Sequence, residues 1–167
     1  LKEYGIDGVW MQRFVGEVVD NPDGKDHFDK VLANAMKGSD QYQRAIGVMY
    51  DLGGYSPGRY EKVLADAQFL YDTYASVQKY YIHENGKPML ALWGVGFNPT
   101  ERGYDNADIQ KLVDGLQEQG WSIMLGVTTY WRAGGGDTYT PGKMSLHKLI
   151  KDVDAIDANF ATSLVVS

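Results

Sequence analysis

Four short apolar segments recur along the chain, at residues 8–13, 45–51, 89–94 and 122–127. None of them shows the alternation of polar and apolar residues that is typical of a strand with one face in water. Strands of a parallel sheet are covered on both faces and have this continuous apolar character. The pattern therefore predicts four buried, parallel strands.

Segments with a helical pattern separate these strands. In each segment, apolar residues recur at spacings of three and four, which places them along one face of a helix. The predicted helices cover residues 27–36, 59–75, 107–118 and 146–156. Residues 1–7 have the features of a helix end, because Gly5 is a common helix stop.

The remaining segments are predicted to be connections. Residues 14–25 carry the turn signal Asn-Pro-Asp-Gly and are expected to form a loop. A turn is expected at residues 84–88, and polar loops at residues 98–105 and 128–143. The tail, residues 159–167, ends in Leu-Val-Val and is either a fifth strand or disordered.

The order of strand, loop and helix repeats with a period of about 35–45 residues, which is typical of βα units on a parallel sheet. Polar and aromatic residues gather after the strands, as they do in a (β/α)-barrel with its site at the carboxyl-terminal rim. A complete barrel has about 250 residues, whereas this chain has 167. We therefore expect one domain, residues 1–167, that forms part of a (β/α)8 TIM barrel with about four or five βα units.

Composition and charge exclude several classes of function. The net charge is −6 without a Lys/Arg-rich stripe, so nucleic-acid binding is not expected. No apolar run approaches the ~20 residues that span a bilayer. The chain has no cysteine, and its histidines, at positions 27, 83 and 147, do not follow strands. We therefore expect neither a metal site nor a cofactor, while the oligomeric state is left open.

Asp51 is the first candidate for chemistry. It ends a predicted strand and is followed by Gly53 and Gly54, which let a ligand approach closely. Glycosidic bonds are commonly cleaved by two carboxylates, and Asp51 suits either role. The alternative is that Asp51 only caps the turn that follows it. No second carboxylate stands out; the possible partners are Glu17, Asp20, Glu101, Asp105 and Asp137.

Other side chains after the strands suit a sugar ligand. Gln12 and Arg13 end the first strand, and Arg13 either holds a sugar hydroxyl with its rigid fork or pairs with Glu17. Trp93 ends the third strand and is either a stacking platform for a sugar ring or part of the core. Trp131 and Arg132 lie in a glycine-rich loop that either contacts a ligand or packs on the surface.

Four segments, YGIDGVWMQRF, GVMYDLGGYSP, GKPMLALWGVGFNP and GVTTYWR, occur in this order. As a set they resemble the bacterial glycoside hydrolase family 71/99-like proteins, which include endo-acting α-mannosidases, α-mannanases and α-1,3-glucanases. The resemblance covers residues 1–132 and implies a (β/α)8 barrel of which about half is present. It also implies a secreted, periplasmic or cell-surface location.

The α-mannosidase branch of this family carries its catalytic glutamates in a His-Ile-Glu-Pro-Tyr type motif. By order in the chain, that motif corresponds to residues 49–55, where Asp51 replaces a glutamate and Gly53 and Gly54 stand in place of a second acid. The partner acid then comes from another strand, or the protein binds glycans without cleaving them.

The resemblance leads to three hypotheses. In the first, the protein hydrolyses α-linked polysaccharide or glycan with Asp51 as a catalytic residue. The side chains expected to line its sugar cleft are Gln12, Arg13, Tyr55, Trp93, Trp131 and Arg132. In the second, the same scaffold is a non-catalytic glycan-binding protein. In the third, the chain is a structural fragment without activity, whose open sheet edges favour dimers or aggregates.

Overall fold

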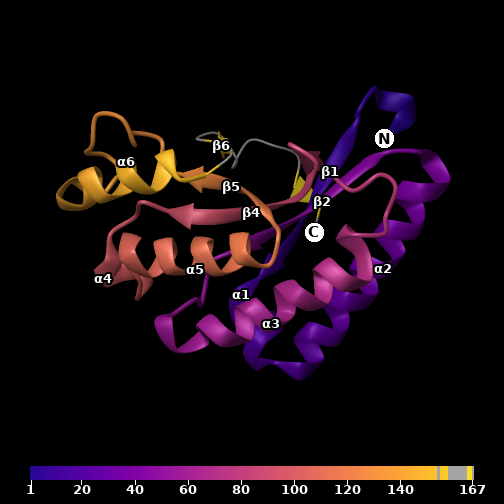
Figure 1. Ribbon diagram of the computed structural model, residues 1–167, viewed down its shortest axis with the longest axis horizontal. Coiled ribbons are helices and arrows are strands. Elements are labelled where there is room, and N and C mark those ends of the chain that lie inside the picture. The colour runs from indigo at the N-terminus through magenta and orange to yellow at the C-terminus, as the bar shows by residue number, and fades with distance from the viewer. Residues whose placement is uncertain (154, 158–164, 167) are drawn as a thin grey trace.

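The structure is a computed structural model that describes residues 1–153, 155–157 and 165–166. Its sheet has the strand order β6-β5-β4-β2-β1-β7, and neighbours along this path are parallel (Figure 1). The strands are β1 Gly8–Phe14, β2 Ala45–Asp51, β4 Lys87–Val95, β5 Ser122–Val127, β6 Ala155–Asp157 and β7 Val165–Val166. A short strand, β3 His83–Glu84, pairs antiparallel with β4. The expected parallel βα arrangement is confirmed, whereas the (β/α)8 barrel of which it would form a part stays a prediction.

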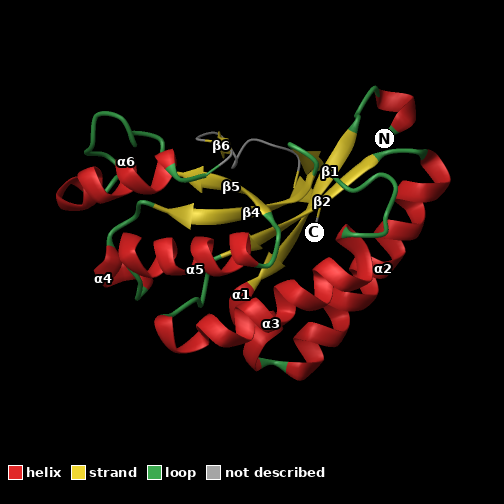
Figure 2. Ribbon diagram, in the orientation of Figure 1, coloured by secondary structure: helices red, strands yellow, loops and turns green. Residues whose placement is uncertain are grey.

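The helices of the βα units form a layer on one face of the sheet. Figure 2 shows α1, α2, α3 and α5 below the strands. The helices are α1 Val15–Asp20, α2 Pro22–Tyr42, α3 Tyr60–Leu70, α4 Pro99–Arg102, α5 Asn106–Glu118 and α6 Lys143–Lys151. Helix α3 continues through a π-helical segment, Tyr71–Ala75. Single 3-10 turns occur at η1 Lys2–Tyr4, η2 Pro57–Arg59 and η4 Thr140–Gly142.

The prediction of a loop over residues 14–25 is wrong. Phe14 completes β1, α1 follows directly, and α2 begins at Pro22. The side chain of Asn21 accepts a hydrogen bond from the Gly24 amide at 3.1 Å, and Pro22 stands in the first turn of the helix. Asn-Pro-Asp-Gly thus forms a helix cap, because proline at the first helical position has no amide to leave unpaired.

Two expectations near the carboxyl terminus change as well. The predicted helix over residues 146–156 ends at Lys151, and Ala155 already belongs to β6. Val165 and Val166 pair with Trp10 and Met11 as β7, which agrees with the first of the two alternatives given for the tail, a strand. Residues 159–164 and 167 of that predicted tail lie outside the described residues.

The core lies between the sheet and the helix layer. Side chains from the central strands, such as Ile46, Val48, Leu92 and Leu125, are at most 1% exposed there. A smaller cluster covers the opposite face, where Trp10, Trp93 and Met124 pack against Met49 and Ala91. Both faces of the central strands are therefore covered, which explains their continuous apolar sequences.

Candidate functional site

A row of in-register residues marks the carboxyl ends of the parallel strands. Phe14 of β1 is the partner of Asp51 of β2, which is the partner of Trp93 of β4. The backbone register continues through Gly126 of β5 to Asp157 of β6. Ligands of α/β proteins bind at this edge of the sheet, so the row is the candidate site.

Asp51 and Gln12 form a pair within this edge. The Gln12 amide Nε2 donates to Asp51 Oδ2 at 2.9 Å. The other carboxylate oxygen, Oδ1, accepts from the Gly53 amide at 2.8 Å, which is the turn-capping contact considered as the alternative role. The hydrogen bond to Gln12 and the turn-capping contact with Gly53 are therefore present together. The half-buried carboxylate is thus held at both oxygens, by a strand neighbour and by its own turn.

Trp93 lies next to Asp51 in the row but shares its ring surface with other groups. The Phe97 ring stacks on it, with centroids 5.2 Å apart and an angle of 27° between the planes. The Arg102 guanidinium lies over the Phe97 ring at 4.3 Å. Phe97 and Arg102 were not predicted, although an aromatic residue two positions after a strand end is a signal that could have found the first.

Arg13 lies on the opposite face of β1 from Gln12. It is 2% exposed and donates to both carboxylate oxygens of Asp66 in α3 at 2.7 Å, and to Asp29 in α2 at 2.7 Å. Its hydrogen bonds reach neither Asp51 nor Glu17. The prediction that Arg13 lines the same cleft as Gln12 is a mistake about strand geometry, because successive side chains of a strand point to opposite faces.

Asp66 is the centre of this buried network. It also accepts hydrogen bonds from the Tyr50 hydroxyl at 2.5 Å and from Lys25 Nζ at 2.8 Å. Burial alone would raise the pKa of Asp66, but hydrogen bonds and charge from Arg13 hold it below its usual value. Burial raises the pKa of Tyr50 well above its usual value, so its hydroxyl remains a donor. The network joins β1, β2, α2 and α3 beneath the site.

Tyr55 is a core residue rather than a lining residue of the edge. It is 3% exposed and packs in the main core. Its ring meets that of Tyr104 edge-on at 5.4 Å, and burial raises the pKa of Tyr55 to about 12. The hydroxyl of Tyr104 donates to the Gly94 carbonyl at 2.8 Å. The predicted sugar contact of Tyr55 is therefore not supported by its position.

Trp131 and Arg132 belong to the loop between β5 and α6. The Trp131 ring is half-buried and meets the His147 ring edge-on at 6.0 Å, while exposed Arg132 lies over the Trp131 ring at 4.3 Å. Asp137 folds this loop by accepting from the amides of Thr129 at 2.8 Å and Tyr130 at 3.3 Å. Within the part of the chain that the structure describes, no hydrogen bond joins Trp131 or Arg132 to Asp51 or Gln12.

The predicted partner acids have structural contacts of their own. Glu17 accepts from Asn21, and Asp20 pairs with Arg59 and Lys62. Asp105 caps α5, Asp137 binds its own loop as described, and Glu101 is exposed on α4. Among the side chains that the structure describes, Asp51 is the only carboxylate in its row. The described residues also contain no group of three or more His, Asp or Glu that could hold a metal ion.

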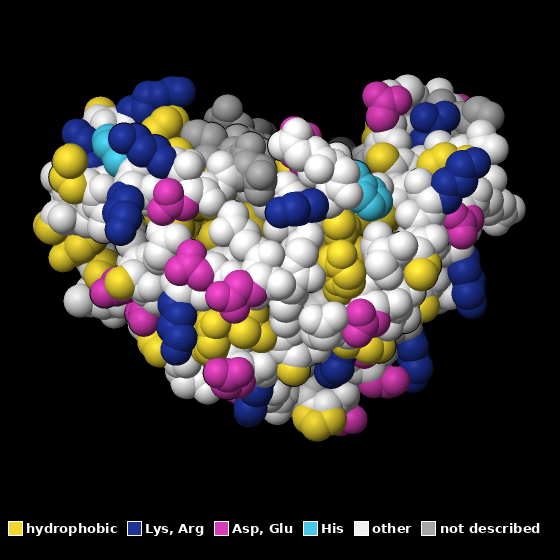
Figure 3. All heavy atoms as spheres, in the orientation of Figure 1, with side chains coloured by type: hydrophobic (Ala, Val, Ile, Leu, Met, Phe, Trp, Pro, Cys, Tyr) yellow, Lys and Arg dark blue, Asp and Glu magenta, His cyan; other side chains and the backbone are white. Residues whose placement is uncertain are grey.

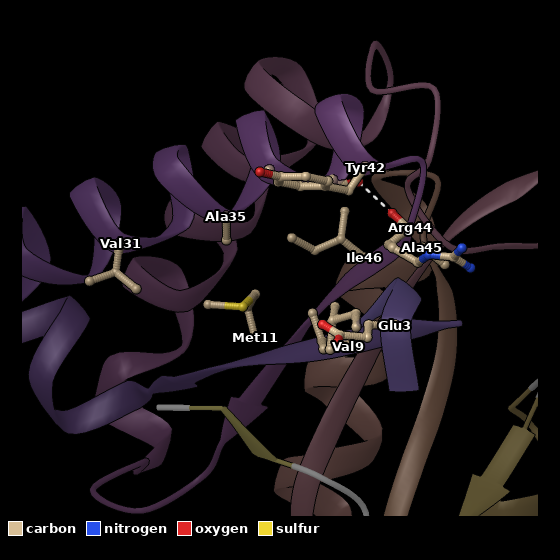
Figure 4. Close-up of a pocket in the computed structure, with 12 residues that line it drawn as sticks. Glu3, Val9, Met11, Val31, Ala35, Tyr42, Arg44, Ala45 and Ile46 are labelled. Carbon is tan, nitrogen blue, oxygen red and sulfur yellow. Dashed lines mark hydrogen bonds between the residues drawn. The ribbon is translucent and has the colours of Figure 1, made fainter. Parts of the chain in front are cut away.

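An apolar groove lies at the other end of the strands. Figure 4 shows Val31 and Ala35 of α2 facing Met11 of β1 and Ile46 of β2 across it. Its volume is about 780 Å³, and Tyr42 lies along its border. The groove is lined from the amino-terminal parts of β1 and β2, so it is separate from the edge that carries Asp51. No signal in the sequence indicated it.

Acidic and basic side chains are interspersed over the face of the molecule seen in Figure 3. Among the described helices, none combines the length and apolar character needed to cross a membrane. Comparison of the chain with protein-family models, with curated proteins and with solved structures found no match in any of the three.

Proposed function

We propose that the protein is a glycoside hydrolase that acts on α-linked polysaccharide or glycan, on a scaffold that forms part of a (β/α)8 barrel. The observation that carries the proposal is the Asp51–Gln12 pair beside Trp93 at the carboxyl ends of the parallel strands. A carboxylate, an amide and an aromatic ring are the groups that bind sugar hydroxyls and the apolar face of a sugar ring.

The hydrogen bonds of Asp51 favour one of the two carboxylate roles. Both of its oxygens accept, from Gln12 and from the Gly53 amide. A general acid must carry the proton that it gives to the leaving oxygen, whereas a nucleophile or base acts as a carboxylate. We therefore assign Asp51 the role of nucleophile or base, with Gln12 holding the orientation of its carboxylate.

The general acid has to come from another part of the chain. Among the described side chains of the row, Asp51 is the only carboxylate.

A second candidate function is glycan binding without hydrolysis. It is favoured by the presence of a single carboxylate among the described side chains of the row. Gln12, Asp51 and Trp93 would then bind sugar hydroxyls and the ring face, and no proton would be transferred.

Release of reducing ends from α-mannan and α-1,3-glucan tests the proposal. We expect hydrolysis by the unchanged chain, and a fall of about 10²–10⁴-fold in Asp51→Asn, because the amide can no longer act as nucleophile or base. Asp26→Asn is the matched control, since Asp26 is exposed and, among the described residues, pairs only with Lys30 on α2.

The outcomes separate the hypotheses. Full activity in Asp51→Asn contradicts the assignment of Asp51. Binding of the two polysaccharides without release of reducing ends, lost in Gln12→Ala, supports the glycan-binding function instead. A folded chain that neither binds nor hydrolyses the polysaccharides contradicts both the hydrolase and the glycan-binding function. The hypothesis of a structural fragment then remains.

A further inference from the structure

The turn that follows Asp51 is connected to an element distant in sequence. Asp51 Oδ1 accepts from the Gly53 amide, and the Gly53 carbonyl in turn accepts from the Gly16 amide at 3.0 Å. Gly16 lies in α1, the short helix that follows β1. A chain of two hydrogen bonds therefore leads from the carboxylate to the helix that comes after the neighbouring strand.

The backbones of α1 and of this turn approach each other closely. A Cβ atom at Gly54 would lie 2.8 Å from the Cα of Gly16, and Gly54 has a φ of +79°. A Cβ atom at Gly16 would lie 3.4 Å from the Gly53 carbonyl oxygen. Gly54 thus meets two requirements that only glycine satisfies easily, namely a left-handed backbone and the close passage of another chain segment.

A second connection joins the turn after Asp51 to the carboxyl-terminal end of α1. Arg59, at the end of η2, donates to the Gly54 carbonyl and to Asp20 Oδ2. Asp20 is the last residue of α1. The turn is therefore bonded to α1 directly through Gly16, and to the end of the same helix through Arg59 and Asp20. The Arg59 and Asp20 side chains are 33% and 30% exposed.

We propose that α1, Asp20 and Arg59 form a clamp that positions the Asp51 carboxylate for the sugar. The inference rests on the proposed function of Asp51. Arg59 is a positioning residue, because it touches Gly54 and Asp20 and reaches Asp51 only through the turn. Small backbone shifts change the orientation of a carboxylate on a short loop. A misplacement of about 1 Å can lower a reaction rate about 100-fold.

Arg59→Ala and Lys62→Ala test the clamp as a matched pair. Lys62 also binds Asp20, through Oδ1, but its side chain donates to no other described group. Both variants therefore remove a cation from Asp20, and only Arg59→Ala removes the donor to the Gly54 carbonyl. We expect kcat for polysaccharide hydrolysis to fall about 10- to 100-fold in Arg59→Ala, with a KM near that of the unchanged chain. In Lys62→Ala, kcat should change less than about twofold.

Hydrogen exchange of the Gly16 and Gly53 amides gives a readout that needs no activity. We expect faster exchange of both amides in Arg59→Ala and unchanged exchange in Lys62→Ala, with both variants folded by circular dichroism. Arg59→Lys, which can donate to one of the two acceptors, should lie between them. Equal exchange in both alanine variants overturns the clamp even if Asp51 proves catalytic. Faster exchange only in Arg59→Ala supports the clamp even if the protein hydrolyses no glycan, and that result would contradict the proposed function alone.

Discussion

Removing the carboxylate of Asp66 should be the most destabilising single change in the buried network. Arg13 and Asp66 have side chains that are 2% and 3% exposed and make two hydrogen bonds to each other at 2.7 Å. Asp66→Ala leaves the Arg13 guanidinium buried with Asp29 as its remaining partner, and it also removes the acceptor of the Tyr50 hydroxyl. Loss of one partner of a buried ion pair costs about 3–5 kcal/mol, so we expect the free energy of unfolding to fall by this amount.

Urea unfolding followed by tryptophan fluorescence measures this change, with Asp29→Ala as the control. The Asp29 side chain is 26% exposed and pairs with the same arginine, so its removal should cost about 1 kcal/mol at most. The double variant Arg13→Met, Asp66→Leu should recover much of the loss, because an apolar pair leaves no buried charge. A loss below about 1 kcal/mol for Asp66→Ala, or a double variant less stable than Asp66→Ala, would contradict this prediction.

Two further predictions concern acid and the second face of the sheet. The folded-state pKa of Asp66 is lowered, so its contribution to stability is present above the unfolded pKa of about 3.9 and is lost as pH falls through the folded pKa. Unfolding free energies measured from pH 7 downward should therefore fall less steeply in acid for the Arg13→Met, Asp66→Leu variant than for the unchanged chain. Parallel curves for the two proteins would contradict this. Gly47→Val should lower the melting temperature and destabilise by about 1–3 kcal/mol, because a Cβ there meets the Trp10 ring at 2.4 Å, whereas an unchanged melting temperature would show that the ring moves freely.

Much of the fold could be predicted because burial on both faces leaves a strong signal in sequence. The strands at residues 45–51 and 122–127 have the predicted bounds, and the predicted helices over residues 59–75 and 107–118 exist. The prediction of a loop at Asn-Pro-Asp-Gly was wrong because the same residues suit a turn and a helix cap. Only the helical residues beyond it, up to Tyr42, decide between the two.

The site was predicted in part. Asp51, Gln12 and Trp93 lie together because parallel strands bring their carboxyl ends to one edge. The position of Arg13 could have been inferred from strand alternation, since its neighbour Gln12 faces the other way. The pairing of Arg59 with Asp20 could not, because the two residues are 39 positions apart and meet only through the packing of α1 on the turn after β2.

A titration of the isotope-labelled protein with an α-linked oligosaccharide, followed by NMR, tests the proposed sugar site at Asp51 most directly. We expect the signals of the Gly53 amide, the Gln12 side-chain amide and the Trp93 indole to change, because these groups surround Asp51. The indole of Trp121, which is fully buried in the core, should stay unchanged. Shifts confined to the groove beside Ala35 and Tyr42, with the Gly53 and Gln12 signals unmoved at saturation, would contradict a sugar site at Asp51.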